Sequence, residues 1–302
     1  MYIGIRDVCL FQASYETLAQ GMGDLKLDCV EVAVDRNMRI PAPVEALGRP
    51  RLSIANQLAA VEASQAYARQ GLRISGLLLA NNFNAEDRAA EIKWACHALE
   101  VAEVVGADVV RLDAAMTGQQ TLALDKRVAI FAEAVEEVLT QASDDSVPLA
   151  VENHGFQGNN PEWLAALLDR VASDRFGLTL DAANFYWAGY PLSRVYELCE
   201  QFAPYTRHVH CKNIDYPPEY RQQRRPLGWE YGQYVAPIQQ GNIDYSEIVQ
   251  ILAEAGYQGG LHIEDESLAK FDPDQRPQSL RAQADYLAGL INGVGHRRFW
   301  AG

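Results

Sequence analysis

The stretch VPLAVENHG, residues 147–155, is a short apolar run that ends on a carboxylate, an amide and an imidazole. A run of this length, bounded by polar residues and rich in aliphatic side chains, is typical of a buried strand in a parallel sheet. A buried strand that ends on Glu152, Asn153 and His154 raises the question of what these polar groups contact there. Answering it requires the arrangement of the strands on either side.

Similar apolar runs recur along the whole chain, and long stretches with helical spacing separate them. We expect a helix to end at Gly106, a second to begin after Asn160 with Pro161 in its first turn, and others to begin near Ser53 and Asp244. The expected strands cover residues 2–6, 27–34, 73–79, 108–113, 147–152, 176–181, 207–212 and 260–265.

Eight strands alternating with helices in 302 residues favour an α/β fold of the closed (β/α)₈ TIM-barrel type, in which one domain would cover residues 1–302. The lack of a G-x-G-x-x-G motif after the first strand argues against a dinucleotide-binding open sheet. Two connections, 35–52 and 213–243, are longer than a barrel needs. The second is rich in tyrosine and tryptophan, which suits an active-site lid or a subunit contact equally well.

The composition excludes several classes of protein. A net charge of -14 argues against a nucleic-acid partner, whose phosphates attract basic surfaces. We see neither a signal peptide nor an apolar run of the ~20 residues that cross a bilayer, so no membrane partner is expected. The five cysteines are scattered and form no C-x-x-C pair, which suits a reducing compartment. These features predict a cytoplasmic protein.

The C-terminal tail, residues 293–302, contains Phe299 and Trp300 next to two arginines. Large apolar side chains that stay exposed often mark an interface. The tail therefore predicts a homo-oligomer.

Ionisable residues stand at the ends of four successive expected strands. Glu152, Asp181 and Glu264 each end a strand, and the strand between the last two offers His208 and His210. Catalytic groups of a TIM barrel lie at the carboxyl ends of its strands, so these side chains should meet at one rim. Carboxylates that converge without a cation repel one another, and a divalent ion removes this repulsion. Three oxygens and one imidazole suit Mn²⁺, Mg²⁺ or Co²⁺, and Zn²⁺ is compatible with the same donors.

The motifs around these residues resemble those of the xylose isomerase-like TIM barrel family, which includes sugar and sugar phosphate isomerases and epimerases. They are VENH (151–154), LDAAN (180–184), HVHCKN (208–213), PIQQGNIDY (237–245) and GYQGGLHIE (256–264). The resemblance implies that Glu152, Asp181, His210 and Glu264 hold one divalent metal, with His210 preferred over His208. It also implies that the two glutamates are the catalytic residues that exchange a proton.

The chain departs from the family pattern at several positions. Asn184 stands where many epimerases have a histidine, and Asn213 where aspartate is commoner. The AP endonuclease branch builds a multi-metal site with histidines on earlier strands. The strands concerned here end on Asp35, Asn81 and Asp113, which, together with the acidic charge, argues against a nuclease.

Other residues near the rim are candidates for contacts with a substrate or with the metal ligands. Four residues are expected to bind the substrate: His154, Asn184, Lys212 and Trp187. The alternatives are a loop-capping role for His154, loop packing for Trp187 and a solvated surface position for Lys212. His208 and His262, each two residues before a metal ligand on the same strand face, are expected to lie one layer below the metal.

Three functions follow from this reading. The first is a metal-dependent isomerase or epimerase of a sugar or sugar-derived ketone, in which an α-proton leaves and the metal stabilises the resulting enediolate. The second is a lyase or dehydratase acting on an inosose, a dehydroshikimate or a 3-keto-glycoside through the same enolisation. The third is a barrel that binds a ligand without catalysis. The substrate is expected to be a small carbohydrate-like molecule.

Overall fold

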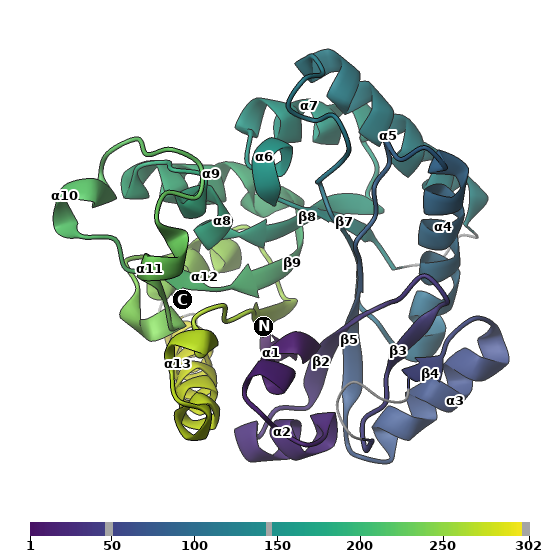
Figure 1. The fold of residues 1–302 in the computed structure, drawn as a ribbon, viewed down its shortest axis with the longest axis horizontal. Coiled ribbons are helices and arrows are strands. Elements are labelled where there is room, and N and C mark those ends of the chain that lie inside the picture. Colours follow the sequence, from purple (N-terminus) through teal and green to yellow (C-terminus); the bar gives the residue numbers. More distant parts are fainter. Residues whose placement is uncertain (46–50, 143–146, 298–302) are drawn as a thin grey trace.

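A closed barrel of eight parallel strands forms the centre of the molecule (Figure 1). The computed structural model describes residues 1–45, 51–142 and 147–297. Around the barrel the strands follow the order β1, β12, β9, β8, β7, β6, β5, β2, after which β2 pairs with β1. Their bounds are β1 (Tyr2–Arg6), β2 (Cys29–Ala33), β5 (Arg73–Leu79), β6 (Val110–Leu112), β7 (Leu149–Glu152), β8 (Phe176–Asp181), β9 (Thr206–Cys211) and β12 (Gly260–Ile263). The predicted TIM barrel is confirmed.

Helices surround this barrel (Figure 1). Buried apolar side chains from both helices and strands form one hydrophobic core cluster. The longer helices are α2 (Leu18–Leu25), α3 (Gln57–Ala68), α4 (Arg88–Val105), α5 (Leu124–Gln141), α7 (Pro161–Val171), α9 (Leu192–Phe202), α12 (Tyr245–Glu254) and α13 (Arg276–Arg297). Short helices and 3₁₀ turns are α1 (Asp7–Gln12), α6 (Gly155–Gly158), α8 (Ala182–Trp187), η1 (Ala203–Tyr205), η3 (Leu268–Lys270) and η4 (Pro273–Gln275). Within the described ranges, no helix combines the length and the apolar character that crossing a membrane would require.

Capping residues explain where several helices begin and end. The Asn160 side chain accepts hydrogen bonds from the first turn of α7, and the Asp244 side chain does the same for α12. Gly106 ends α4 in the left-handed conformation. The expected helix start near Ser53 is wrong, because Ser53 belongs to a strand and α3 begins after its cap, Asn56.

The two long connections contain secondary structure of their own. In the first, β3 (Arg39–Pro41) pairs antiparallel with β4 (Arg51–Ser53). The second contains β10 (Asn213–Ile214), α10 (Pro218–Arg221), α11 (Tyr231–Tyr234), β11 (Val235–Ala236) and η2 (Ile238–Gln240).

Arg225 holds the second long connection, residues 213–243, against the barrel. The Arg225 guanidinium lies 4.5 Å from the ring centroid of Tyr186 and 4.2 Å from that of Tyr216. It also donates hydrogen bonds to the backbone carbonyls of Tyr186 and Tyr190, at 2.9 and 3.1 Å. Cation–π and hydrogen-bond contacts of this kind hold the connection against α8.

The tail that predicts an oligomer cannot be placed. Residues 298–302, which include Phe299 and Trp300, lie outside the described part of the chain. The homo-oligomer remains a prediction.

Candidate metal centre

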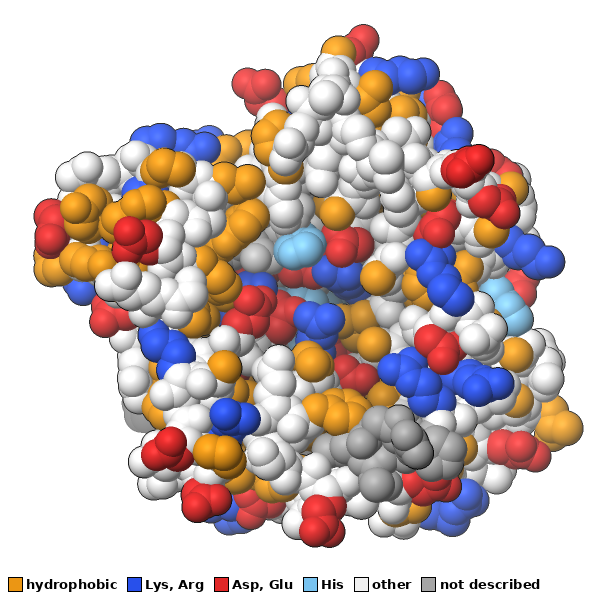
Figure 2. Space-filling model, viewed as in Figure 1, with side chains coloured by type: hydrophobic (Ala, Val, Ile, Leu, Met, Phe, Trp, Pro, Cys, Tyr) orange, Lys and Arg blue, Asp and Glu red, His pale blue; other side chains and the backbone are white. Residues whose placement is uncertain are grey.

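Four ionisable side chains meet at the carboxyl end of the barrel. Glu152 and Asp181 are the last residues of β7 and β8, His210 lies near the end of β9, and Glu264 follows β12 directly. All four are buried, and one donor atom from each lies within 4.8 Å of the others. Figure 2 shows acidic, basic and histidine side chains gathered in the middle of this face of the molecule.

Two arginines from other strands hold the outer oxygens of the two glutamates. Arg6, the last residue of β1, contacts Oε1 of Glu264. Arg111, on β6, contacts Oε2 of Glu152 through Nε at 2.6 Å and through a second guanidinium nitrogen. Each glutamate is thus anchored on one side, and its other oxygen, Oε2 of Glu264 or Oε1 of Glu152, lies near the imidazole of His210.

The inner donor atoms leave a place for a cation. The Nδ1 atom of His210 lies 3.3 Å from Oε1 of Glu152 and 3.4 Å from Oε2 of Glu264. Among the described residues this nitrogen is buried without a hydrogen-bond partner, and Oδ2 of Asp181 is contacted by the ammonium of Lys212 at 3.1 Å. A buried polar atom without a partner is costly, and an ion bound at Nδ1 would satisfy it. Three carboxylate oxygens and one imidazole nitrogen therefore fit a divalent ion.

The electrostatics of the cluster reflect this crowding of carboxylates. Burial raises the pKa of Asp181 to about 6, although the ammonium of Lys212 opposes the shift. Burial would also raise the pKa of Glu152, but Arg111 holds it well below its usual range. Burial also acts to raise the pKa of Glu264, but the ammonium of Lys212 holds that pKa below its usual range. Both glutamates are therefore ionised at neutral pH.

Lys212 differs from a solvated rim lysine. Its side chain is buried, and its ammonium lies 2.8 Å from Glu264, 2.9 Å from Glu266 and 3.1 Å from Asp181. Tyr231, in the second long connection, donates a hydrogen bond to the other oxygen of Glu266 at 2.9 Å. Lys212 therefore contacts two of the four candidate metal ligands.

The other candidate substrate-binding residues lie at different depths. The His154 side chain is 43% exposed, and its Nδ1 lies 3.0 Å from Asp113. Asn184 is buried and donates from its side chain to Oε1 of Glu152 at 2.8 Å. Trp187 packs against Gly228 of the second long connection. The contact is close, since a Cβ added to Gly228 would lie 3.2 Å from the indole nitrogen. Only the exposed ring of His154 faces solvent to a large extent.

His208 and His262 lie inside the barrel and are buried, as expected for the layer below the candidate metal ligands. Their rings are 4.2 Å apart, and Nε2 of His262 lies 2.7 Å from the hydroxyl of Ser75. A carboxylate that sequence reasoning overlooked, Glu31 of β2, contacts both His208 and His210.

The overlooked residues Glu31, Arg6 and Arg111 left a signal in the sequence. Glu31 and Arg111 interrupt apolar strands, in DCVEVAV and DVVRLD, and Arg6 ends the first strand. A charged residue inside a buried strand needs a charged or hydrogen-bonding partner. This signal indicates that partners exist, and the closed barrel identifies them.

A sequence model of the family described as xylose isomerase-like TIM barrel matches residues 21–290. The chain belongs to this family. Solved structures with the same fold include a 3-keto-D-glucoside 4-epimerase and a probable 3-DHS dehydratase, and the buried cluster described above is consistent with a divalent metal site.

Solved structures share the fold over nearly the whole chain. A xylose isomerase domain protein from Planctomyces limnophilus has a TM-score of 0.69 at 17% identity, covering 97% of this chain and 98% of its own. The IOLI protein with a bound zinc atom has a TM-score of 0.68 at 15% identity, with coverages of 94% and 96%. The 3-keto-D-glucoside 4-epimerase YcjR from E. coli has a TM-score of 0.64 at 16% identity, with coverages of 97% and 99%.

A curated relative, the uncharacterised protein MJ1311 of Methanocaldococcus jannaschii, is 27% identical over 139 residues, which are 44% of this chain. The match spans 42% of the length of that relative.

Proposed function

We propose that this protein is a divalent-metal-dependent isomerase or epimerase of a sugar or sugar-derived ketone. The observation that carries the proposal is the convergence of four buried donor atoms, two of which belong to glutamates kept ionised by arginine or lysine. The zinc atom bound by the IOLI protein and the epimerase activity in the name of YcjR support it.

In this proposal Glu152, Asp181, His210 and Glu264 hold the ion. A bound divalent ion supplies Lewis-acid polarisation of a carbonyl oxygen and its neighbouring hydroxyl. Glu152 and Glu264 come from strands separated by β8 and β9, so they approach the site from different sides. One takes the α-proton, and the other returns a proton to the opposite face of the carbon for epimerisation or to the adjacent carbon for isomerisation.

The surrounding residues orient the substrate and the two glutamates. His154 presents its exposed ring to the mouth of the barrel, with Asp113 fixing that ring through Nδ1. Asn184 and Lys212 hold Glu152 and Glu264 and border the same space. Trp187 supplies an apolar wall. These assignments predict that a small polyhydroxylated ketone binds above the inner donor atoms.

The first test is the metal content of the purified protein after incubation with Mn²⁺ and removal of free ion. We expect about one metal per chain in the wild type and loss of the ion in Glu152→Ala and His210→Ala. Glu266→Gln is the matched control, because it removes a nearby carboxylate charge and leaves every inner donor atom in place. A wild type that retains no metal would contradict the proposal and favour a binding module.

The second test follows proton exchange. Ketoses, inososes and keto-glycosides are incubated with the Mn²⁺-loaded protein in D₂O, and NMR detects deuterium at the α-carbon. Glu152→Gln and Glu264→Gln should each abolish turnover of the substrate found in this way. Substrates that exchange equally well with both variants would exclude the glutamates as proton carriers.

Elimination is a second candidate, and one observation favours it. The hydrogen bond from Nδ1 of His154 to the Asp113 carboxylate raises the pKa of His154 and so favours the protonated ring, the form that can donate a proton to a leaving hydroxyl. The D₂O experiment distinguishes the two reactions. Loss of water from the substrate, dependent on His154, indicates a dehydratase, whereas deuterium incorporation without loss of water indicates an isomerase or epimerase.

A further inference from the structure

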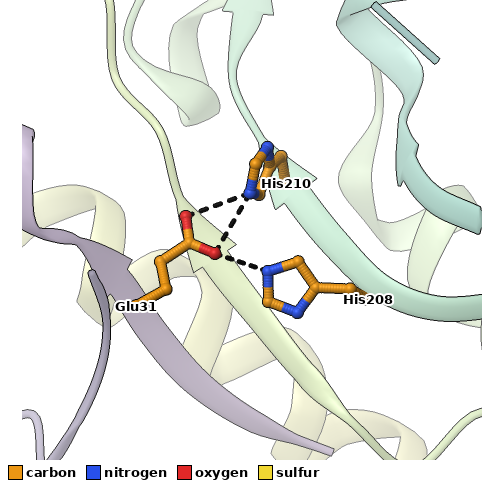
Figure 3. A group of neighbouring side chains, drawn as sticks. All are labelled: Glu31, His208 and His210. Atoms are coloured by element: carbon orange, nitrogen blue, oxygen red, sulfur yellow. Dashed lines mark hydrogen bonds and ion pairs between the residues drawn. The ribbon is translucent and has the colours of Figure 1, made fainter. Parts of the chain in front are cut away.

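The carboxylate of Glu31 faces His208 and the candidate metal ligand His210 in one hydrogen-bonded group (Figure 3). One of its oxygens lies 2.5 Å from Nε2 of His208, and Nε2 of His210 lies 3.0 Å from the other. All three side chains are at least 98% buried. A carboxylate on β2 thus contacts two histidines on β9, and two strands, β1 and β12, separate β2 from β9 around the barrel.

Irregularities in the sheet accompany this arrangement. The register between β2 and β5 shifts between Val30 and Glu31, so that Glu31 lies opposite Gly76 and Ser75 is passed over. The register between β8 and β9 also shifts, just before Thr179 pairs with His208. Such bulges re-aim side chains near active sites. Here one shift lies in the pairing of β2 with β5, next to Glu31, and the other in the pairing of β8 with β9, next to His208.

Glu31, His208 and His210 do not form a second metal site. Two ligands of one zinc-sized ion, each about 2.0 to 2.2 Å from it, lie about 3 Å or more apart at the usual angles. The 2.5 Å separation of Glu31 and His208 is shorter and is the distance of a charge-assisted hydrogen bond. The carboxylate therefore accepts hydrogen bonds from the histidines.

The contact between Glu31 and His210 determines which ring nitrogen of His210 keeps its lone pair. The carboxylate of Glu31 is buried and faces Nε2 of both histidines, at 2.5 Å for His208 and 3.0 Å for His210. A carboxylate accepts hydrogen bonds, so the nitrogen that faces it, Nε2 of His210, carries a proton. In a neutral imidazole Nδ1 then keeps its lone pair, and this is the atom that faces Glu152 and Glu264.

We infer that Glu31 is a positioning residue that sets the tautomer and the orientation of His210 so that Nδ1 binds the metal. His208 contacts Oε2 of Glu31, the same oxygen that accepts a hydrogen bond from His210 at 3.1 Å, and so holds the carboxylate in place. Outer partners of this kind commonly change metal affinity 10- to 100-fold when they are removed. The inference rests on the metal site proposed above and concerns a residue of β2, a strand that contributes none of the four candidate metal ligands.

The test measures metal affinity and the state of the imidazole together. Glu31→Gln keeps the shape and one acceptor oxygen, whereas Glu31→Leu removes both acceptors. We expect the dissociation constant for Co²⁺, measured by calorimetry, to rise about tenfold for Gln and about a hundredfold for Leu. The visible absorption bands of bound Co²⁺ should also shift, and ¹⁵N NMR of the Zn²⁺-loaded wild type should show His210 protonated on Nε2.

Ser75→Ala is the matched control. It removes a buried hydrogen bond to His262 in the same layer and leaves the contact between Glu31 and His210 in place. Its affinity should stay within about twofold of the wild type. If Glu31→Leu does not fold, the isosteric Gln variant still decides the question.

Wild-type affinity and spectrum in both Glu31 variants, or metal on Nε2 of His210, would overturn the inference while leaving the metal site intact. A wild type that binds no ion would overturn the proposed function as well. The two failures are therefore distinguishable.

Discussion

Replacing Arg111 with methionine tests whether the cluster is built as a balanced set of charges. Arg111 is 6% exposed and contacts Glu152 through two nitrogens. It also donates to the carbonyl of Leu79 at 3.1 Å and lies 3.7 Å from Asp113. Methionine fills much of the same volume without charge. The variant leaves the carboxylate of Glu152 buried without its strongest partner.

The size of the effect follows from this burial. Removing one partner of a buried ion pair costs about 3–5 kcal/mol, because the remaining charge stays desolvated. Glu152 keeps its hydrogen bond from Asn184 at 2.8 Å, so we expect a loss of about 3 kcal/mol in the free energy of unfolding of the metal-free protein at pH 7. Metal loading should reduce this loss, because the ion supplies the missing positive charge.

The stability loss of Arg111→Met should depend on pH in a direction that follows from the pKa of Glu152. Without Arg111 the pKa of Glu152 should rise, because the strongest of the effects that oppose burial is then removed. A carboxyl whose pKa is higher in the folded state than in the unfolded state favours folding at low pH, and this contribution disappears as the pH rises through the folded-state pKa. The variant should therefore lie closer to the wild type at pH 5 than at pH 7.

Urea unfolding followed by circular dichroism, in EDTA and with Mn²⁺, measures these differences. Arg194→Met is the control, because its pair with Glu197 has side chains 42% and 58% exposed and should contribute about 0.5 kcal/mol or less. A loss below about 1 kcal/mol for Arg111→Met at pH 7 in EDTA would refute the charge-balance argument.

Three further predictions address the ligands, the second long connection and a helix cap. Burial raises the pKa of Asp181 to about 6, so a proton competes with the metal for this carboxylate. The affinity for Mn²⁺, measured by calorimetry, should therefore rise between pH 5 and pH 7, by up to about tenfold per pH unit for each proton released. A constant affinity would contradict this. Gly241→Ala should cost about 1–3 kcal/mol in urea unfolding, because the added Cβ would overlap the buried side chain of Asn213, whereas Gly232→Ala, with open space around it, should cost under about 0.5 kcal/mol. Asn160→Ala should lower the melting temperature through a loss of about 1 kcal/mol at the start of α7, and an unchanged temperature would show that the cap contributes nothing.

The sequence predicted the barrel and the meeting of four ionisable side chains because both depend on local patterns. Each expected strand lies within about two residues of an observed one, and parallel strands that alternate with helices must all end at one rim. Residues at the ends of four successive strands, such as Glu152 and Asp181, then become neighbours whatever the exact tilt of the barrel.

The partners of these residues could not be predicted in the same way. Arg6 contacts Glu264 across the closure of the barrel, and Glu31 contacts His208 across its interior. Such pairs depend on the register, the bulges and the closure of the sheet, which the sequence pattern leaves undetermined. The burial of Lys212 also depends on Glu266 and on Tyr231 from a long connection, whose path no periodicity describes.

The anchoring of the glutamates has a consequence for which ions the protein accepts. Calcium takes 6–8 oxygen ligands and often uses both oxygens of a carboxylate. Here the outer oxygens of Glu152 and Glu264 are already engaged by guanidinium groups, so each can offer one oxygen only. Two strands that contribute no ligand, β1 and β6, thus limit the coordination number. The protein should discriminate against calcium in favour of smaller ions that complete their coordination with substrate oxygens.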